Sequence, residues 1–513
     1  VASRPGAVAG TFVLDTVGRP STASGLTGPV ILTDSPRRRE VNVGVGAFGG
    51  SATLSFEDPL RIEKPVRDYG SSELAGAEAV AAMLGGTRLS ASSSASDADA
   101  SPAPDVSAAP FAAFDGSRTT LWRPNPKADL RGSWLDLALP RPVSTDGGVV
   151  LLDEGTAIRS LQVMADGGST TIEGRDDTAR LPPSRTRTLR LSVASVDPQA
   201  GPTQLAAAGI REVTIPEVRL ERTIVLPQVP GGVAVDQVQL TADVGRDGCL
   251  TVNGAVRCAR GLVRIGEEAA GIDRTWVSRA PDVQPVSLMV RGLASERIIG
   301  EIKAAKGLPA RVEASSVLVP GVGGSALVAA DGDPHTTWIA ATNDPDPTLT
   351  VTWPESVTIS GLELSLDDWA AASPPTRARV VVDGNREDVT LDATGRARFP
   401  AMSGTTVAVH FGIDQAKSSL DPYTLETMAM PMGVSELAFT GAPRVPVTSA
   451  ASSGQAVSLA CGQGPQVVVN GRSYDSAVDT TVGALLRGDL VPARVCQPVD
   501  IPSGTVRLQV TRP

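Results

Sequence analysis

An Asp-Gly-Asp turn in the second half of the chain has the residue types that bind a hard cation. Asp331 and Asp333 flank a glycine, and Thr336 follows shortly after them. Calcium takes about six to eight oxygen ligands from carboxylates, carbonyls and hydroxyls, and a tight turn directs such oxygens toward one point. Glu436, on a strand expected late in the same domain, could complete the ligand shell. The alternative is an Asx-type turn without a metal.

A similar turn occurs in the first half of the chain. Its corresponding set is Asp115, Ser117, Thr120 and Glu212. A serine stands here in place of the second carboxylate, and fewer charges bind calcium less tightly. We therefore expect calcium at both turns, held more weakly at the first, with the role of fixing the loop rather than doing chemistry.

A tryptophan beside two carboxylates forms a candidate sugar platform. Trp369 follows Asp367 and Asp368 in a loop expected between two strands, and no counterpart is evident in the first half. An aromatic ring can stack on the apolar face of a sugar, as such rings stack on nucleic-acid bases, while carboxylates accept hydrogen bonds from hydroxyls. The alternative is a loop tryptophan folded onto the domain beneath it.

The four cysteines suggest two disulfides. The segment CLTVNGAVRC has Asn-Gly at its centre, the strongest signal for a two-residue hairpin. Counting outward from this turn, Cys249 faces Cys258 in a non-hydrogen-bonded pair with Cα atoms roughly 4.5 Å apart, which is within disulfide reach. Cys461 and Cys496 pair by elimination. Two disulfides would place the chain in an oxidising compartment.

Composition argues against several classes of function. The net charge of −10 disfavours nucleic acid as a partner, and no run of about 18 or more apolar residues predicts a membrane span. Neither of the two histidines, His335 and His410, accompanies a recognisable nucleophile motif. We expect that this segment is not catalytic by itself, although a longer parent protein could be an enzyme.

The chain contains a large internal repeat. Similar short segments recur in the same order about 217 residues apart, for example LTVNG ending at Gly254 and VVVNG ending at Gly471. A repeat of this length indicates duplicated domains rather than a solenoid of short units. The repeat pairs four tryptophans, which are expected in equivalent core positions: Trp122 with Trp338, and Trp134 with Trp353.

Alternating Val- and Thr-rich runs such as LTVTW and RARVVVD, punctuated by Gly, Pro and Asp, predict a mostly β chain of sandwiches or jelly rolls. We expect tandem jelly-roll sandwiches at 87–220 and 310–441, which alternate with smaller β domains at 221–309 and 442–513. Residues 1–86 are expected to be β-rich and to end a preceding domain. Their single helix would cover SSELAGAEAVAAML and end at Gly85.

The two larger domains resemble galactose-binding-like domains of the discoidin, or coagulation-factor type C, group. The resemblance rests on an Ala-Ser-Ser strand, then Asp-Gly with a following Thr and Trp, then a second Trp-containing strand. In this sequence Asp115, Gly116 and Trp122 match the pattern in the first domain, as Asp331 and Trp338 do in the second. The resemblance implies eight-stranded jelly rolls, which are often carbohydrate-binding.

The wider arrangement resembles the soluble C-terminal portion of the actinobacterial cell-wall arabinofuranosyltransferases of the D type. A segment reading ILTDSPRRREVNVG precedes the discoidin-like units, and modules carrying VVVNG follow them. The resemblance implies a glycan-binding accessory region on the extracytoplasmic, or periplasmic, face of the cell membrane. A membrane domain of the same parent chain, absent here, would attach it.

This resemblance also implies the ligand class. The expected ligand is cell-wall arabinan or galactan, of the kind found in arabinogalactan and lipoarabinomannan, and the parent would be a glycosyltransferase of cell-wall biogenesis. The alternative is a structural or protein-docking β scaffold without sugar binding.

Overall fold

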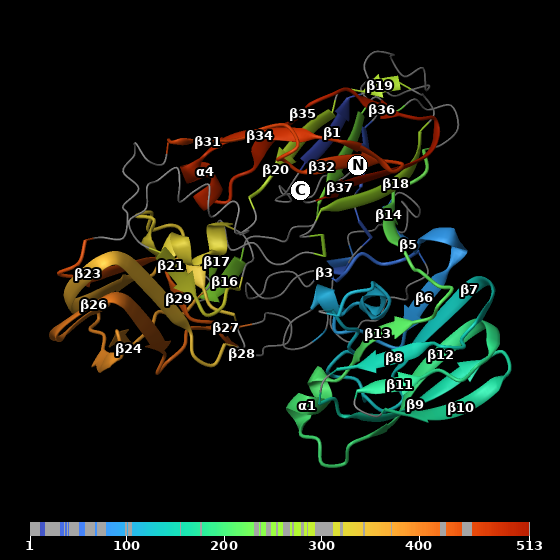
Figure 1. Ribbon diagram of the computed structural model, residues 1–513, viewed down its shortest axis with the longest axis horizontal. Coiled ribbons are helices and arrows are strands. Elements are labelled where there is room, and N and C mark those ends of the chain that lie inside the picture. Colours follow the sequence, from blue (N-terminus) through green and yellow to red (C-terminus); the bar gives the residue numbers. More distant parts are fainter. Residues whose placement is uncertain are drawn as a thin grey trace.

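The computed structural model describes residues 11–15, 31–34, 36–37, 39–40, 51–56, 67–68, 78–97, 100, 105–118, 120–153, 155–174, 177–229, 235, 237–242, 248–252, 255–259, 267–268, 271–278, 282–284, 286–292, 311–318, 322–341, 344–370, 372–420, 427–443 and 454–511. They form two β-sandwiches and a third β domain assembled from distant parts of the chain (Figure 1). Within these ranges, no helix has the length and apolar character needed to cross a membrane.

The first sandwich packs a five-stranded sheet against a three-stranded one. Alternate residues of its strands face the core, where Leu135, Leu137, Leu189 and Leu191 are almost fully buried, as the two-residue period of a strand predicts. The larger sheet has the order β10 (Gly168–Glu173), β9 (Ile158–Ala165), β12 (Arg185–Val196), β7 (Trp134–Ser144) and β6 (Arg88–Ala91), and the smaller has β11 (Thr178–Arg180), β8 (Val149–Leu152) and β13 (Ile210–Thr214).

The second sandwich is built on two long strands. Strand β23 pairs with β26 over most of its length and with β30 at its end, so it runs from one face of the sandwich toward the other. The strands are β21 (Arg311–Ala314), β23 (Thr348–Ser365), β26 (Arg396–Gly412), β24 (Arg377–Val382), β25 (Asn385–Thr390) and β30 (Glu436–Thr440), with a short pair, β22 (Trp338–Ile339) and β29 (Gly433–Val434). A mostly β chain with tandem sandwiches was predicted, and this fold class is confirmed.

Backbone pairing confirms that the two sandwiches are copies. Trp122 pairs with Ile210 in the first, and Trp338 pairs with Val434 in the second. Both indole rings are fully buried. Each indole N–H donates to the carbonyl oxygen of a serine two residues beyond the end of β6 or β21, at 3.1 Å in the first sandwich and 2.9 Å in the second. The repeat therefore preserves a buried tryptophan together with its hydrogen-bond partner.

The second tryptophan pair is not equivalent, and that prediction was wrong. Ala91 lies opposite Leu135 in the first sandwich, while Ala314 lies opposite Leu349 in the second. Trp134 therefore corresponds to Thr348. Trp353 lies further along its strand, is buried at 4% exposure, and meets Phe439 edge-on with ring centroids 5.6 Å apart. Trp134 instead lies half-buried on the outer face of its sheet.

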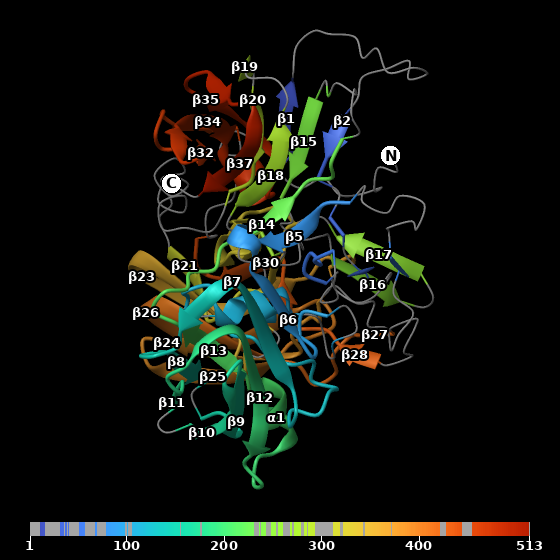
Figure 2. The same cartoon turned by 90° about the vertical axis from the view of Figure 1, so that its right-hand side faces the viewer.

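The smaller β regions do not form separate domains, contrary to the predicted boundaries. Strands from 11–83, 222–290 and 456–511 share two sheets and one hydrophobic core (Figures 1 and 2). We call this unit the composite domain. One sheet has the order β2 (Ile31–Thr33), β15 (Gln237–Thr241), β1 (Thr11–Asp15), β20 (Val286–Val290), β35 (Val491–Val495), β34 (Ser476–Thr481) and β31 (Ala456–Leu459), and the other has β33 (Arg472–Tyr474), β32 (Gln466–Val469), β37 (Gly504–Thr511), β18 (Ile272–Ser278), β14 (Arg222–Val225) and β5 (Val80–Met83).

The helix predicted before Gly85 is wrong at its C-terminal end. Val80–Met83 forms strand β5, which pairs antiparallel with β14. Ala81 is buried while its neighbours are less so, which suits an edge strand. Pairing with a strand about 140 residues away outweighs the helix propensity of an alanine-rich segment. The earlier part of the predicted helix lies outside the described residues.

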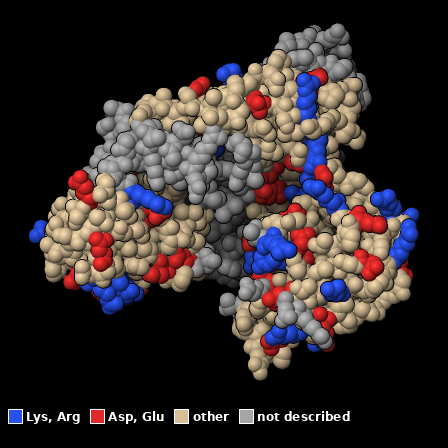
Figure 3. Space-filling view, viewed as in Figure 1, with Lys and Arg blue, Asp and Glu red and all other residues tan. Residues whose placement is uncertain are grey.

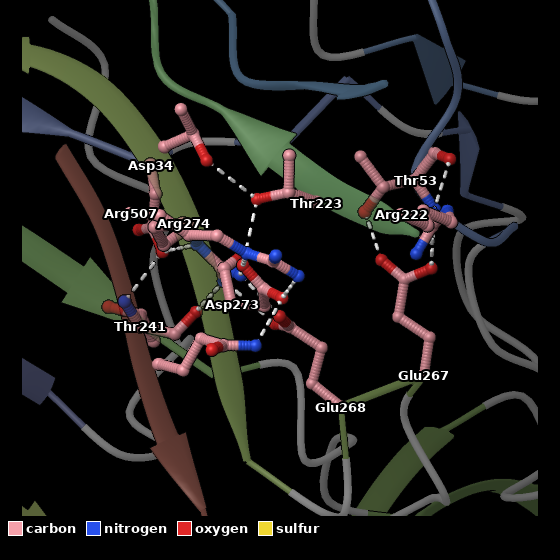
Figure 4. A network of polar contacts seen from close by, with 12 residues as sticks. Asp34, Thr53, Arg222, Thr223, Thr241, Glu267, Glu268, Asp273, Arg274 and Arg507 are labelled. Atoms are coloured by element: carbon pink, nitrogen blue, oxygen red, sulfur yellow. Dashed lines mark hydrogen bonds and ion pairs between the residues drawn. The ribbon is translucent and has the colours of Figure 1, made fainter. Parts of the chain in front are cut away.

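A buried arginine joins the segments of the composite domain (Figure 4). The Arg274 side chain on β18 is only 1% exposed, and its guanidinium donates to Asp34 at 2.6 Å and to Glu268 at 2.7 Å. It also donates to the carbonyl oxygen of Thr241 at 2.9 Å. The guanidinium and the two carboxylates compensate each other's buried charge. One side chain therefore joins three distant segments of the chain.

The cysteine predictions have different outcomes. Cys461 and Cys496 form a disulfide, as predicted. Strands β16 (Gly248–Val252) and β17 (Ala255–Ala259) pair as the predicted hairpin, with Cys249 directly opposite Cys258. Their side chains and the turn between the strands lie outside what the structure describes, so this second disulfide stays a prediction.

Candidate functional site

The predicted turn of the second sandwich forms around a buried carboxylate. Asp331 is 3% exposed and accepts the backbone N–H of Asp333 at 2.8 Å. The Thr336 hydroxyl lies 3.0 Å from the same carboxylate and 2.9 Å from the carbonyl oxygen of Asp333. Gly332 has a φ of +81°, a conformation that favours glycine. The structure therefore brings these three predicted ligands together around one carboxylate.

The turn of the first sandwich repeats this geometry. Asp115 accepts the backbone N–H of Ser117 and the hydroxyl of Thr120, each at 2.8 Å. Glu212, on β13, reaches the turn from the neighbouring strand and accepts the backbone N–H of Gly116 at 3.1 Å. All four predicted residues of this set therefore meet. Unlike Asp331, the carboxylate of Asp115 is exposed.

The two carboxylates of the first turn repel each other. Burial, followed by the nearby negative charge of Asp115, raises the pKa of Glu212 from its ordinary 4.5 to about 7, although the N–H of Gly116 opposes the rise. Like charges that share a site raise the pKa of one of them, and a bound cation relieves such repulsion. The donor set of this turn therefore fits a cation.

Glu436 holds the place of Glu212 in the second sandwich. Glu212 pairs with Leu151 on β8, and Glu436 pairs with Ser365 on β23. Within the described ranges no group of three or more His, Cys, Asp or Glu side chains gathers. A cation at either turn would therefore take further ligands from hydroxyl and carbonyl oxygens, which calcium accepts readily.

The loop after β23 presents the predicted aromatic side chain to solvent. Trp369 is 53% exposed, so it is not folded into the sandwich. Its backbone N–H donates to Asp367 at 2.9 Å. The backbone N–H of Asp367 donates in turn to the fully buried hydroxyl of Ser435, also at 2.9 Å. The ring therefore stands on a loop that is anchored to the domain interior.

The roles of the two neighbouring carboxylates differ. The Asp367 side chain is only 13% exposed, and its second oxygen lies 3.1 Å from Nδ1 of His335. It thus positions the loop more than it offers a surface for ligand. Asp368, which directly precedes Trp369 in the chain, is exposed, and the His335 side chain is 82% exposed. Among the described residues, Asp368 in this loop and His335 in contact with it are therefore exposed polar groups near the position of Trp369 in the chain.

Sequence reasoning missed the part of His335 because the residue lies in the candidate cation turn, more than thirty residues before Trp369. Ser435, which precedes Glu436, joins the two regions: its hydroxyl contacts that of Thr337 at 2.8 Å and accepts the backbone N–H of Asp367. The segments beside the cation turn therefore also anchor the tryptophan loop, so the two candidate sites are neighbours.

The first sandwich has a counterpart of this loop but, as expected, no counterpart of its tryptophan. Asp153 follows β8 as Asp367 follows the last residues of β23. The backbone carbonyl oxygen of each aspartate accepts the backbone N–H of the residue three positions later, at 3.0 Å in both sandwiches. Gly155 stands where Trp369 would be, and its φ of +65° favours glycine. Arg211 pairs with Asp153. This loop therefore has no aromatic platform, and a salt bridge occupies its carboxylate.

Known proteins resemble this chain over most of its length. Two alpha-(1->3)-arabinofuranosyltransferases match: the protein of Mycolicibacterium smegmatis is 30% identical over 94% of this chain and 35% of its own length, and that of Mycobacterium tuberculosis is 31% identical over 95% and 36%. The family model for the third carbohydrate binding module of arabinofuranosyltransferase D matches residues 309–451. The resemblance to the D-type arabinofuranosyltransferases is confirmed.

A solved structure supports the same architecture. The cryo-EM structure of arabinofuranosyltransferase AftD from mycobacteria superposes with a TM-score of 0.68 at 22% identity, covering 96% of this chain and 39% of that one. The chain spans about a third of the length of the D-type relatives that it matches. The matched module coincides with the second sandwich, which carries Trp369.

Proposed function

We propose that this chain is a glycan-binding accessory region of an arabinofuranosyltransferase that acts in cell-wall arabinan synthesis. It would hold the growing arabinan or galactan near a catalytic domain on the extracytoplasmic face of the membrane. The observation that carries this proposal is the exposed Trp369 on an anchored loop of the carbohydrate-binding module. An exposed ring at a fixed position is a surface on which the apolar face of a sugar can stack without ordering a mobile loop first.

The polar groups beside the ring suit a neutral, hydroxyl-rich ligand. Asp368 can accept hydrogen bonds from hydroxyls, and His335 can donate or accept according to its tautomer. Figure 3 shows acidic and basic side chains interspersed over the described part of the face in view, much of which is uncharged. A broad field of one sign, which would favour a polyanion or a polycation, does not appear there.

Calcium at the two Asp-Gly turns is part of the proposal. The turn of the second sandwich adjoins the tryptophan loop through His335 and Thr337. A cation there would fix the turn and, through these contacts, the loop. Its part in binding would be to hold the platform in place rather than to contact sugar.

A binding screen of this chain against cell-wall arabinan and galactan oligosaccharides, with and without calcium, tests the proposal. We expect weak binding, stronger in calcium, and no turnover of the oligosaccharide. The absence of binding to every such glycan would favour the alternative of a structural or protein-docking scaffold. Hydrolysis that persists through purification would show that the chain is an enzyme.

A further inference from the structure

The outer face of the five-stranded sheet of the first sandwich carries an unusual set of side chains. Trp134 lies half-buried there, and Met164 is 44% exposed. Exposed large apolar side chains grouped on one surface mark interaction sites more often than chance. None of these residues belongs to the loops that carry the candidate cation turn or the counterpart of the tryptophan loop.

The indole ring of Trp134 is held rigidly. The guanidinium of Arg190, on the adjacent strand, stacks over the ring at 4.3 Å from its centroid. Asp136 accepts two hydrogen bonds from this guanidinium, at 3.2 and 2.5 Å. The stack fixes the orientation of the ring, and the ion pair cancels the charge of the arginine. The cluster is therefore a neutral, preorganised aromatic surface.

Strand register places polar groups in line with this cluster. Trp134 lies opposite Ser192, Ser192 lies opposite Gln162, and Gln162 lies opposite Thr171, each pair on neighbouring strands. In the neighbouring row Arg190 lies opposite Met164. Adjacent strands are roughly 4.8 Å apart, so the rows form a band of hydroxyl, amide and apolar groups that crosses four strands.

The second sandwich has different chemistry at the same positions. Through the register of its sheet, Thr348 replaces Trp134, and Arg379 replaces Gln162. Likewise, Val381 replaces Met164, and Ala408 replaces Arg190. The aromatic band is therefore a feature of the first sandwich alone, and that sandwich lacks the loop tryptophan of the second.

We propose that the band formed by Trp134, Asp136, Gln162, Met164 and Arg190 binds an uncharged polysaccharide across the outer face of the first sandwich. The two sandwiches would then bind one polymer by different surfaces, a loop end in the second and a sheet face in the first. Two weak sites on one chain bind a polymer more tightly than either site alone, because binding at one raises the effective concentration of the polymer at the other. The polymer class rests on the proposed function, whereas the site does not.

Binding of arabinan oligosaccharides to the full chain with Trp369→Ala tests this site apart from the loop site. In that background Trp134→Ala should weaken the remaining binding by about fivefold to 150-fold, and Gln162→Ala should weaken it less. Thr348→Ala, at the matching position of the second sandwich, should have no effect. The indole resonance that disappears in Trp134→Phe should shift as oligosaccharide is added, a readout independent of stability.

The outcomes separate the two proposals. Binding that Trp369→Ala abolishes, with no shift of the Trp134 resonance, refutes the sheet site and leaves the loop site intact. Binding that Trp369→Ala leaves unchanged and that Trp134→Ala alone abolishes supports the sheet site and refutes the loop site. Binding in the Trp369→Ala background that Trp134→Ala leaves unchanged refutes the sheet site, and absence of any binding refutes both.

Discussion

Raising the pH of cation-free protein should lower the stability of the first sandwich, because the fold disfavours the ionised form of Glu212. The pKa of Glu212 is about 7 in the fold, against an ordinary 4.5. The folded state therefore binds this proton more tightly than the unfolded state. The stabilisation is fully present below pH 4.5 and is lost as the pH rises through about 7.

The size of the effect follows from the shift. A rise of this extent would correspond to about 3 kcal/mol for a carboxyl fully shielded from water. Glu212 is 9% exposed, but its repelling partner Asp115 lies at the surface, where solvent screens the interaction. We therefore expect about 1 to 2 kcal/mol. Calcium should remove most of this loss, because a cation stabilises both ionised carboxylates.

Hydrogen exchange measured by mass spectrometry on peptides from β8 and β13 reports the first sandwich separately from the other domains. In chelator, exchange in these peptides should rise between pH 4.5 and pH 7 beyond the intrinsic increase, and added calcium should suppress the rise. Glu212→Gln, which cannot ionise, should abolish it, whereas Glu217→Gln in the exposed turn beyond β13 should not. An identical profile in wild type and Glu212→Gln would refute the reasoning.

Three further predictions concern the other parts of the chain. Arg274→Met should destabilise the composite domain by about 3 to 5 kcal/mol in urea denaturation, because it leaves Asp34 and Glu268 buried without their cation. Arg159→Ala, which removes an exposed ion pair, should cost less than about 1 kcal/mol. Equal effects of the two substitutions would contradict the role of the buried network. Replacing Cys461 and Cys496 by serine should cost about 4 kcal/mol, from the loop of 35 residues that the bond closes, and an unchanged midpoint of urea denaturation would count against it. Intact mass of alkylated, unreduced protein should show no free thiol at Cys249 or Cys258, and labelling there would disprove the second disulfide.

The local features of the chain could be predicted from its sequence. Alternating runs give strands with buried and exposed faces, and the Asn-Gly pair gives the register that sets Cys249 opposite Cys258. The Asp-Gly turns could also be predicted, because their hydrogen bonds join residues only two to five positions apart. Each of these features depends on neighbours in the sequence, so the pattern of residue types contains the information.

The composite domain could not be predicted in the same way. Its sheets join strands more than two hundred residues apart, as where Val13 lies between Gln239 and Ser287, and where Trp276 pairs with Val506. Local periodicity does not identify such partners. The mistaken helix at Val80–Met83 has the same cause, since only its distant partner strand makes that segment extended.

The candidate sites were predicted in part. Trp369 was found because a tryptophan in an acidic loop is conspicuous, but the matching loop of the first sandwich was not recognised, because Gly155 has no side chain to compare. The contact of His335 with Asp367 joins two loops that the sequence separates by 32 residues. The mismatch of Trp134 and Trp353 arose because similar letters stand at different registers, which only strand pairing reveals.

Titration calorimetry of the full chain with neutral arabinan oligosaccharides in calcium, comparing wild type with Trp369→Ala, tests the central claim most directly. Stacking of the exposed ring on sugar predicts that Trp369→Ala weakens binding by about 1 to 3 kcal/mol with no loss of stability. Phe56→Ala, which removes another exposed aromatic side chain, should bind as wild type does. Equal affinity of wild type and Trp369→Ala would contradict the assignment of the glycan site to this loop.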